Sequence, residues 1–225
     1  MSRSWISVAV GKIGCDVTDV THLVHIVDDD ASFRKAIGRL LQTHGYSVEE
    51  YESADQFLER VRAGAEVGCI LLDVSLPGLS GPELQSRLFE VGSPFPIVFL
   101  TGHGDIPTTV RAIKSGAEDF LTKPVQGQAL LNSIGRAIAR HELERRHQQW
   151  LRNARALLDS LTPREREVFD FIVRGKLNKQ AAHALGITER TIKAHRQRVI
   201  DKLGAKSVAD LVSMAERLGV LTLDY

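Results

Sequence analysis

The feature that most constrains the fold is a run of four apolar residues, 69–72, that ends at Asp73. Pro77, Gly78 and Gly81 follow within eight residues and predict a turn. A short apolar run bounded by turn residues is typical of a strand buried on both faces of a sheet. Burying a lone carboxylate is costly, so Asp73 at the end of such a strand requires cations, hydrogen-bond donors or a metal.

Strand and helix patterns alternate through the first half of the chain. Short apolar segments that indicate strands cover residues 23–27, 46–51, 69–73, 96–101 and 117–122. Segments with helical spacing lie between them, at about 31–43, 53–61, 82–90 and 107–115, and a further helix follows Pro124. This alternation implies parallel β-α-β units, so we predict an α/β fold with a five-stranded doubly wound parallel sheet.

Polar residues stand where the predicted strands end. Asp28 and Asp29 end the first strand, Asp73 the third and Thr101 the fourth, and Lys123 follows the fifth. In a doubly wound parallel sheet these ends converge at the topological switch point. Three carboxylates cannot all stay ionised there without a cation, and carboxylate oxygens with water suit Mg²⁺. We therefore predict a magnesium site that holds a phosphoryl group on or beside a carboxylate.

Each of these residues also has an ordinary interpretation. Acidic residues after a strand are commonly solvated or begin a helix, and Thr101 and Lys123 could be an ordinary strand end and an exposed lysine. The segment 102–104, Gly-His-Gly, fits neither the dinucleotide pattern nor a P-loop, and we interpret it as a turn. A metal-dependent phosphotransferase or hydrolase on the same fold is an alternative function, but it leaves the rear of the chain unexplained.

The charge is distributed unevenly along the chain. Residues 23–126 hold 9 Lys/Arg and 15 Asp/Glu, a net charge of −6, whereas residues 127–160 and 161–225 carry +3 and +4. An acidic front and a basic rear indicate a polyanion partner for the rear only. A regulator whose basic rear binds protein is the alternative, and salt-dependent retention on duplex DNA would separate the two.

Composition places no membrane span or disulfide framework in this chain. No apolar run approaches the ~20 residues needed to span a bilayer, and two cysteines are too few for a disulfide scaffold. Gly11, Lys12 and Gly14 interrupt the only apolar run near the start, unlike a signal peptide. We expect a cytoplasmic protein with no membrane partner and a disordered amino-terminal extension over residues 1–22.

Residues 127–160 are predicted to form one long linker helix. Apolar and weakly polar residues there alternate by four and three, as in a coiled-coil seam. They are Leu143, His147, Trp150, Ala154, Leu157 and Leu161. Such a seam could pair two copies of the chain or pack within one chain, and the sequence leaves both possibilities open.

Residues 161–225 form the pattern of a small helical domain. Thr162 and Glu165 make a capping box that starts a helix. A short helix over 178–185, a turn at Gly186 and a third helix beginning at Thr188 predict a helix-turn-helix.

The third helix has two distinct faces. Its apolar face contains Ile192, Val199 and Leu203, and its opposite face contains Arg190, Lys193, Ala194 and Gln197. Basic and amide side chains on an exposed face suit phosphates and base edges in a major groove. A charged, solvated helix in a small bundle is the alternative interpretation.

Residues 23–126 resemble the receiver domain of two-component response regulators. The resemblance rests on residues 27–30, on Asp73 with Pro77 and Gly81, and on Thr101 and Lys123-Pro124. It implies that Asp73 accepts a phosphoryl group from a sensor histidine kinase. It further implies a cis Lys123-Pro124 bond, phosphoryl contacts from Thr101 and Lys123, an aromatic switch at Phe120, and Mg²⁺ ligands from Asp28, Asp29, Asp73 and the Ser75 carbonyl.

Residues 161–218 resemble LuxR-type output domains, and the whole chain resembles the FixJ/NarL subfamily, with residues 101–105 favouring the FixJ side. The resemblance implies base contacts from Lys193, Ala194 and Gln197, and phosphate contacts from Asn178, Lys179, Thr191 and Arg198. It implies that two output domains pair through Val208, Leu211, Val212 and Ala215. The expected function is a non-enzymatic, DNA-binding regulator. Phosphorylation would control its homodimerisation and the transcription of target promoters, with RNA polymerase as a further partner.

Overall fold

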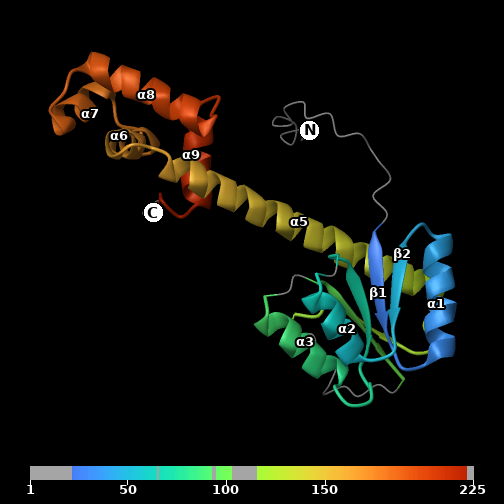
Figure 1. Cartoon of the computed structure of the whole chain (residues 1–225). Coiled ribbons are helices and arrows are strands. Elements are labelled where there is room, and N and C mark those ends of the chain that lie inside the picture. Colours follow the sequence, from blue (N-terminus) through green and yellow to red (C-terminus); the bar gives the residue numbers. More distant parts are fainter. Residues whose placement is uncertain (1–21, 65, 93–94, 103–115, 222–225) are drawn as a thin grey trace, which may run out of the picture. The chain divides into compact units, whose positions relative to one another are not determined.

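The computed structural model describes residues 22–64, 66–92, 95–102 and 116–221. The chain divides between His141 and Glu142 into two compact units. Figure 1 shows the elements of both units and labels those for which there is room. The helix expected at 107–115 lies outside the described residues, as do residues 1–21 of the extension expected over 1–22. Among the described residues, no helix is both long and apolar enough to cross a membrane.

The first unit is built on a five-stranded parallel sheet with strand order β2-β1-β3-β4-β5. Its strands are β1 (Leu23–Val27), β2 (Ser47–Tyr51), β3 (Cys69–Asp73), β4 (Ile97–Thr101) and β5 (Asp119–Thr122). Its helices are α1 (Ala31–Thr43), α2 (Ala54–Arg62), α3 (Gly81–Glu90) and the first part of α5 (Gly127–Asp159). The predicted doubly wound sheet is confirmed. Tyr46 lies outside β2 because its N–H is donated to the Leu41 carbonyl at the end of α1.

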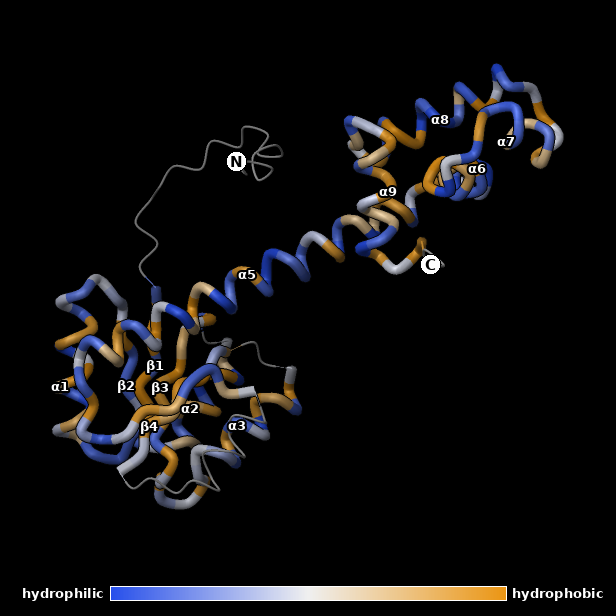
Figure 2. Tube along the Cα trace, turned by 180° about the vertical axis from the view of Figure 1, so that it is seen from behind, coloured by the Kyte–Doolittle hydropathy of each residue, from blue (hydrophilic) through white to orange (hydrophobic). Residues whose placement is uncertain are grey.

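Helices cover both faces of this sheet. Strands β1, β3 and β4 are buried along their whole length, which explains their continuous apolar runs. One core lies on the α2 and α3 face and includes Phe57, Leu84 and Phe99, and the other includes Leu41, Leu130 and Ile134 from α1 and α5. Figure 2 shows the central strands in the colours of hydrophobic residues.

Gly81 begins α3 where the chain passes closest to the end of β3. A Cβ atom there would lie 2.4 Å from the Asp73 carbonyl oxygen and 3.1 Å from both Val74 Cα and Phe99 Cε1. Two of these contacts are with backbone atoms, which cannot move aside as a flexible side chain can. Gly81 is therefore required for close packing of the α3 start beneath Asp73.

We expect Gly81→Ala to destabilise the first unit by about 1–3 kcal/mol, the usual cost of overpacking. Gly135→Ala is the matched control, because a Cβ at Gly135, inside α5, meets nothing within 4 Å. That control should be neutral or stabilising by up to about 1 kcal/mol, since alanine is the better helix former. Urea unfolding followed by far-UV circular dichroism tests both variants. Equal stability of the two would contradict the steric argument.

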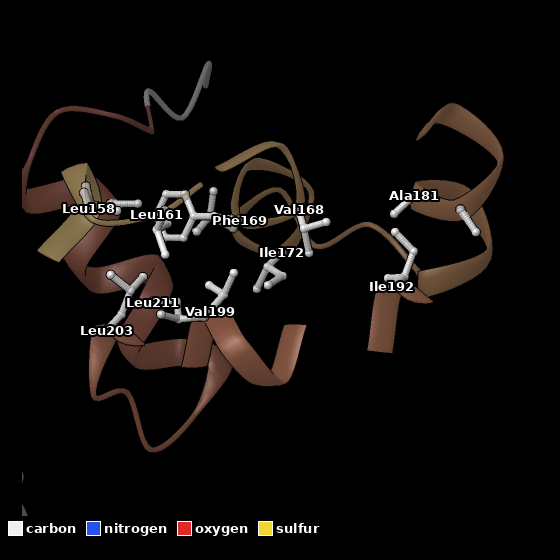
Figure 3. Close-up of a cluster of buried hydrophobic side chains, with 13 residues drawn as sticks. Leu158, Leu161, Val168, Phe169, Ile172, Ala181, Ile192, Val199, Leu203 and Leu211 are labelled. Atoms are coloured by element: carbon white, nitrogen blue, oxygen red, sulfur yellow. The ribbon is translucent and has the colours of Figure 1, made fainter. Parts of the chain in front are cut away.

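The second unit contains the end of α5 with α6 (Pro163–Val173), α7 (Asn178–Leu185), α8 (Glu189–Leu203) and α9 (Val208–Arg217). Thr162 caps α6 through the predicted capping box, and Gly186 and Gly204 end α7 and α8 at φ 65° and 64°. Phe169, Val168 and Ile172 lie in its core, drawn in Figure 3. There Ala181 and Ile192 lie at the end of the cluster away from Leu158. The helix-turn-helix architecture is confirmed.

The end of the predicted coiled-coil seam packs inside the second unit. Ala154 and Leu161 are only 3% and 9% exposed, and Leu158, which lies off that seam, joins them in the core. The Arg217 guanidinium lies 5.1 Å from the Trp150 ring centroid. This end of the stripe therefore packs within the chain, whereas Leu143 is 70% exposed.

Helix α9 corrects one expectation about pairing. Leu211 and Ala215 were expected on the pairing surface, but both are fully buried in the core of their own unit. They face inward because they lie four residues apart on the apolar stripe of α9. Of the four residues expected there, only Val208 and Val212 retain exposed surface.

Candidate functional site

Three carboxylates meet where β1 and β3 end side by side. Val27 pairs with Leu72, so the residues that follow, Asp28 and Asp73, emerge together at the switch point. Ligand oxygens of Asp28, Asp29 and Asp73 all lie within 4.8 Å of one another. Asp28 is fully buried and Asp73 is 6% exposed, whereas Asp29 is exposed.

Lys123 brings a cation into this cluster from the end of β5. Its Nζ donates hydrogen bonds to Asp28 Oδ2 at 2.5 Å and to Asp73 Oδ2 at 2.9 Å. Its backbone N–H is donated to the Thr101 carbonyl at 2.7 Å, which continues the pairing of β5 with β4 past Thr122. Lys123 therefore bridges two carboxylates that precede it in the sequence by 95 and 50 residues.

Burial and charge oppose each other in the electrostatics of the site. Desolvation raises the pKa of Asp28, although hydrogen bonds from Lys123 and from the Asp30 N–H act in the other direction. Burial of the Lys123 ammonium disfavours its charge, but the hydrogen bonds to Asp28 and Asp73 outweigh burial and raise the pKa of Lys123. If all four groups are ionised, one ammonium faces three carboxylates and a net negative charge remains.

The three consecutive aspartates after β1 have different roles. Asp30 is the N-cap of α1: its Oδ1 accepts the N–H groups of Ser32 at 2.8 Å and Phe33 at 3.1 Å. These bonds lower the pKa of Asp30. The ordinary interpretation as a helix start therefore holds for Asp30. Asp28, in contrast, points into the sheet edge and accepts the Asp30 N–H at 3.0 Å.

The other predicted site residues lie around the same edge. Thr101 is buried at the end of β4, on the strand next to β3. The exposed Ser75 follows β3 and donates its backbone N–H to Asp73 Oδ1 at 3.2 Å. Phe120 is half-buried in β5, with its ring centroid 6.2 Å from that of Phe99.

The donor set fits a hard divalent cation. Carboxylate oxygens converge there, no sulfur or imidazole ligand among the described residues belongs to the cluster, and the exposed Asp29 opens it to solvent. Mg²⁺ prefers such oxygen ligands and retains several waters, which an open, acidic edge can accommodate. The negative charge that remains beside Lys123 also favours a cation.

The helix-turn-helix presents the predicted DNA-contacting residues at its surface. Of these seven residues, Asn178 is partly exposed and Lys179, Thr191, Lys193, Ala194, Gln197 and Arg198 are exposed. The Thr191 N–H is donated to Thr188 Oγ1 at 3.2 Å, which fixes the start of α8. Gln197 Nε2 donates a hydrogen bond to Asp201 Oδ1 at 2.8 Å, which leaves the second N–H and the Oε1 of the amide for another partner. The opposite face of α8, with Ile192 and Val199, is buried as predicted.

An ion pair between the buried Glu165 and the exposed Lys202 fixes the far end of α8. Glu165, 3% exposed, accepts the Lys202 ammonium at 2.7 Å and the Thr162 N–H at 2.9 Å. The bond from Lys202 is the main cause that lowers the pKa of Glu165 to about 2. The capping box that starts α6 thus also anchors α8.

The two units together define a class: a doubly wound receiver-type unit with an acidic switch-point site, followed by a helix-turn-helix unit. Residues 24–135 match the response regulator receiver domain, and residues 159–215 match the luxR family of bacterial regulatory proteins. The chain belongs to the two-component response regulators of the FixJ/NarL subfamily, which regulate transcription.

Similar proteins span nearly the whole chain. Nodulation protein W of Bradyrhizobium diazoefficiens is 41% identical over 93% of this chain and 92% of its own length. Response regulator protein TodT of Pseudomonas putida is 39% identical over 97% and 98%. Among solved structures, response regulator StyR is 43% identical, with a TM-score of 0.79, over 88% of this chain and 99% of that one. TodT and StyR are named as response regulators.

Two neighbours of the site were not predicted. The Phe33 ring lies beneath the Lys123 ammonium, 4.4 Å from it, and Arg34 donates a hydrogen bond to the Asp28 carbonyl at 2.5 Å. The helical spacing of residues 31–43 assigned Phe33 to the core only. No signal in the sequence pairs it with a lysine 90 residues later.

Proposed function

We propose that this protein is a DNA-binding response regulator that is phosphorylated on Asp73 by a sensor histidine kinase in a Mg²⁺-dependent reaction. Phosphorylation would control its homodimerisation and hence transcription from target promoters. The observation that carries the proposal is the bridge that Lys123 makes between Asp28 and Asp73 at the switch point. We place the protein in the cytoplasm, where both the kinase's phosphodonor and promoter DNA would be met.

Asp73 is the nucleophile in this proposal. One of its carboxylate oxygens attacks the phosphorus of the kinase's phosphohistidine, an O–P bond forms, and the N–P bond to the imidazole breaks. The Ser75 N–H and the Lys123 ammonium hold the two oxygens of Asp73, which fixes the direction of the carboxylate. Positioning of this kind supplies much of the catalysis in phosphoryl transfer.

Lys123 and Thr101 would bind the transferred phosphoryl group. The ammonium neutralises its negative charge, and the Thr101 hydroxyl donates to one of its oxygens. Asp28, Asp29, Asp73 and the Ser75 carbonyl would hold Mg²⁺. The bound metal would supply charge neutralisation for the attacking carboxylate and the phosphoryl oxygens. The half-buried ring of Phe120 would change its position when Asp73 is phosphorylated.

The output unit would read double-stranded promoter DNA through α8. Lys193, Ala194 and Gln197 are proposed to face the bases, and Asn178, Lys179, Thr191 and Arg198 the phosphates. The basic charge of residues 161–225 favours duplex DNA over a protein partner. RNA polymerase is a further proposed partner once the dimer is on the promoter.

Alanine at Gln197 and at Arg198 should have different effects on DNA binding. Loss of a base contact at Gln197 should cost about 1–3 kcal/mol on the preferred operator and little on scrambled DNA. Loss of a phosphate contact at Arg198 should weaken binding to both duplexes and reduce the salt slope by about one unit. Affinities for both DNAs at several salt concentrations measure the two effects.

The unfolding temperature of both variants must equal that of the wild type, because the two side chains lie on one helix and misfolding of that helix would also weaken DNA binding. Glu216→Ala is a matched control, an exposed residue on α9. Equal losses on both DNAs for Gln197→Ala would remove Gln197 from the base-reading set. If both variants are folded and bind DNA like the wild type, α8 does not contact the major groove through these residues.

A further inference from the structure

Phe33 is the aromatic residue that touches the cation of the site. The Lys123 Nζ lies 4.4 Å from the Phe33 ring centroid, within the range of a cation–π interaction. The Lys123 side chain is only 20% exposed, so water competes weakly for the ammonium. The contact combines two elements far apart in sequence, the first turn of α1 and the end of β5.

The segment that supplies the carboxylate also holds the ring in place. Asp30, the cap of α1, accepts the Phe33 N–H at 3.1 Å and donates its own N–H to Asp28 Oδ1 at 3.0 Å. Arg34 donates to the Asp28 carbonyl. The ring itself packs against the core that α1 and α5 build on the sheet. Phe33 is thus held relative to Asp28 by contacts that do not involve Lys123.

A ring face attracts the Lys123 ammonium without using one of its N–H donors, whereas a third carboxylate would accept a hydrogen bond from it. An ammonium has three N–H donors, and two of them meet Asp28 and Asp73. The attraction to a ring face uses the ring quadrupole and needs no directed acceptor. The flexible four-carbon stem of a lysine is therefore restrained, while an N–H remains for a phosphoryl oxygen.

We propose that Phe33 is a positioning residue that holds the Lys123 ammonium between Asp28 and Asp73, ready to bind the incoming phosphoryl group. This inference rests on the proposed phosphorylation of Asp73. It predicts that an aromatic ring at this position, and not only an apolar side chain, is required for fast phosphorylation.

The test compares Phe33→Leu, which keeps an apolar side chain, with Phe33→Tyr, which keeps the ring. Phosphorylation of the full chain by acetyl phosphate with Mg²⁺ is followed over a range of donor concentrations. Phe33→Leu should slow the reaction roughly 3- to 30-fold, and Phe33→Tyr should restore most of the rate. Phe89→Leu is the matched control, since Phe89 is 81% exposed on α3, and it should react at the wild-type rate.

A second readout needs no phosphorylation. The ε-methylene protons of Lys123, assigned by nuclear magnetic resonance in the absence of donor and Mg²⁺, should be shifted upfield by the ring current of Phe33. The shift should disappear in Phe33→Leu and persist in Phe33→Tyr. Urea unfolding of each variant shows whether the first unit is intact, and Phe33→Met replaces Phe33→Leu if the latter is unfolded.

The outcomes separate the inference from the proposed function. A lost shift together with a slower rate, both restored by tyrosine, supports the positioning role. A lost shift with a wild-type rate overturns that role and leaves phosphorylation of Asp73 intact, and an unshifted Lys123 in the wild-type protein shows that the contact is absent. Failure of the wild-type chain to be phosphorylated would remove the proposed function, and the positioning role with it.

Discussion

Replacement of Asp73 by asparagine should abolish phosphoryl transfer from acetyl phosphate. An amide is a far weaker nucleophile than a carboxylate and cannot form the same acyl phosphate. Asparagine has almost the same shape as aspartate, so its side-chain oxygen can still accept the Ser75 N–H. Incorporation of labelled phosphate into the full chain, with Mg²⁺ present, measures the loss.

The control for this prediction removes a carboxylate elsewhere in the same unit. Asp55 is exposed in the first turn of α2, and Asp55→Asn should be labelled like the wild type. Labelling of Asp73→Asn at the wild-type rate would show that another residue accepts the phosphoryl group.

Lys123→Met should have the second largest effect, on both stability and activity. It leaves the buried Asp28 and Asp73 facing one another without the cation that now bridges them. Removing one partner of a buried pair costs 3–5 kcal/mol when both charges are fully enclosed, so about 2–4 kcal/mol is expected here. Loss of its positive charge at the phosphoryl oxygens should slow phosphorylation by about 10²-fold or more.

A double-mutant cycle separates charge from packing in this prediction. In an Asp28→Asn background the stability lost on Lys123→Met should shrink, because one of the two buried negative charges is gone. Urea unfolding in a Trp5→Phe background resolves the two units, since fluorescence then reports Trp150 in the second unit and circular dichroism reports both. An undiminished loss would mean that the charge of Asp28 contributes nothing to the stabilising effect of Lys123.

Much of the fold and site could be predicted because Asp28, Asp73, Thr101 and Lys123 lie at or directly after the end of a short strand. The sequence marks these strand ends, because an apolar pattern stops at a polar residue, and the parallel topology brings the four side chains to the same end of the sheet. The cis Lys123-Pro124 bond, implied by the family resemblance, is also confirmed.

Features that depend on contacts between distant elements could not be predicted in the same way. Asp28, Asp29 and Asp30 are chemically alike, and only the course of the backbone makes one buried, one exposed and one a helix cap. Ala154 and Leu161 satisfy a coiled-coil spacing, but both are buried within their own chain. The periodic spacing of apolar residues shows which residues share a helix face, but it does not show which element packs on that face.

The order in which the ribosome makes the chain gives the bridge at Lys123 one more consequence. The two carboxylates that it joins are synthesised 95 and 50 residues earlier. Such long-range contacts form late, after the intervening chain has been made and closed into a loop. A nascent chain that stops before residue 123 therefore carries Asp73 without the charge that accompanies it. We expect a truncated product to be a poor phosphate acceptor, so incomplete synthesis should not compete for the signal.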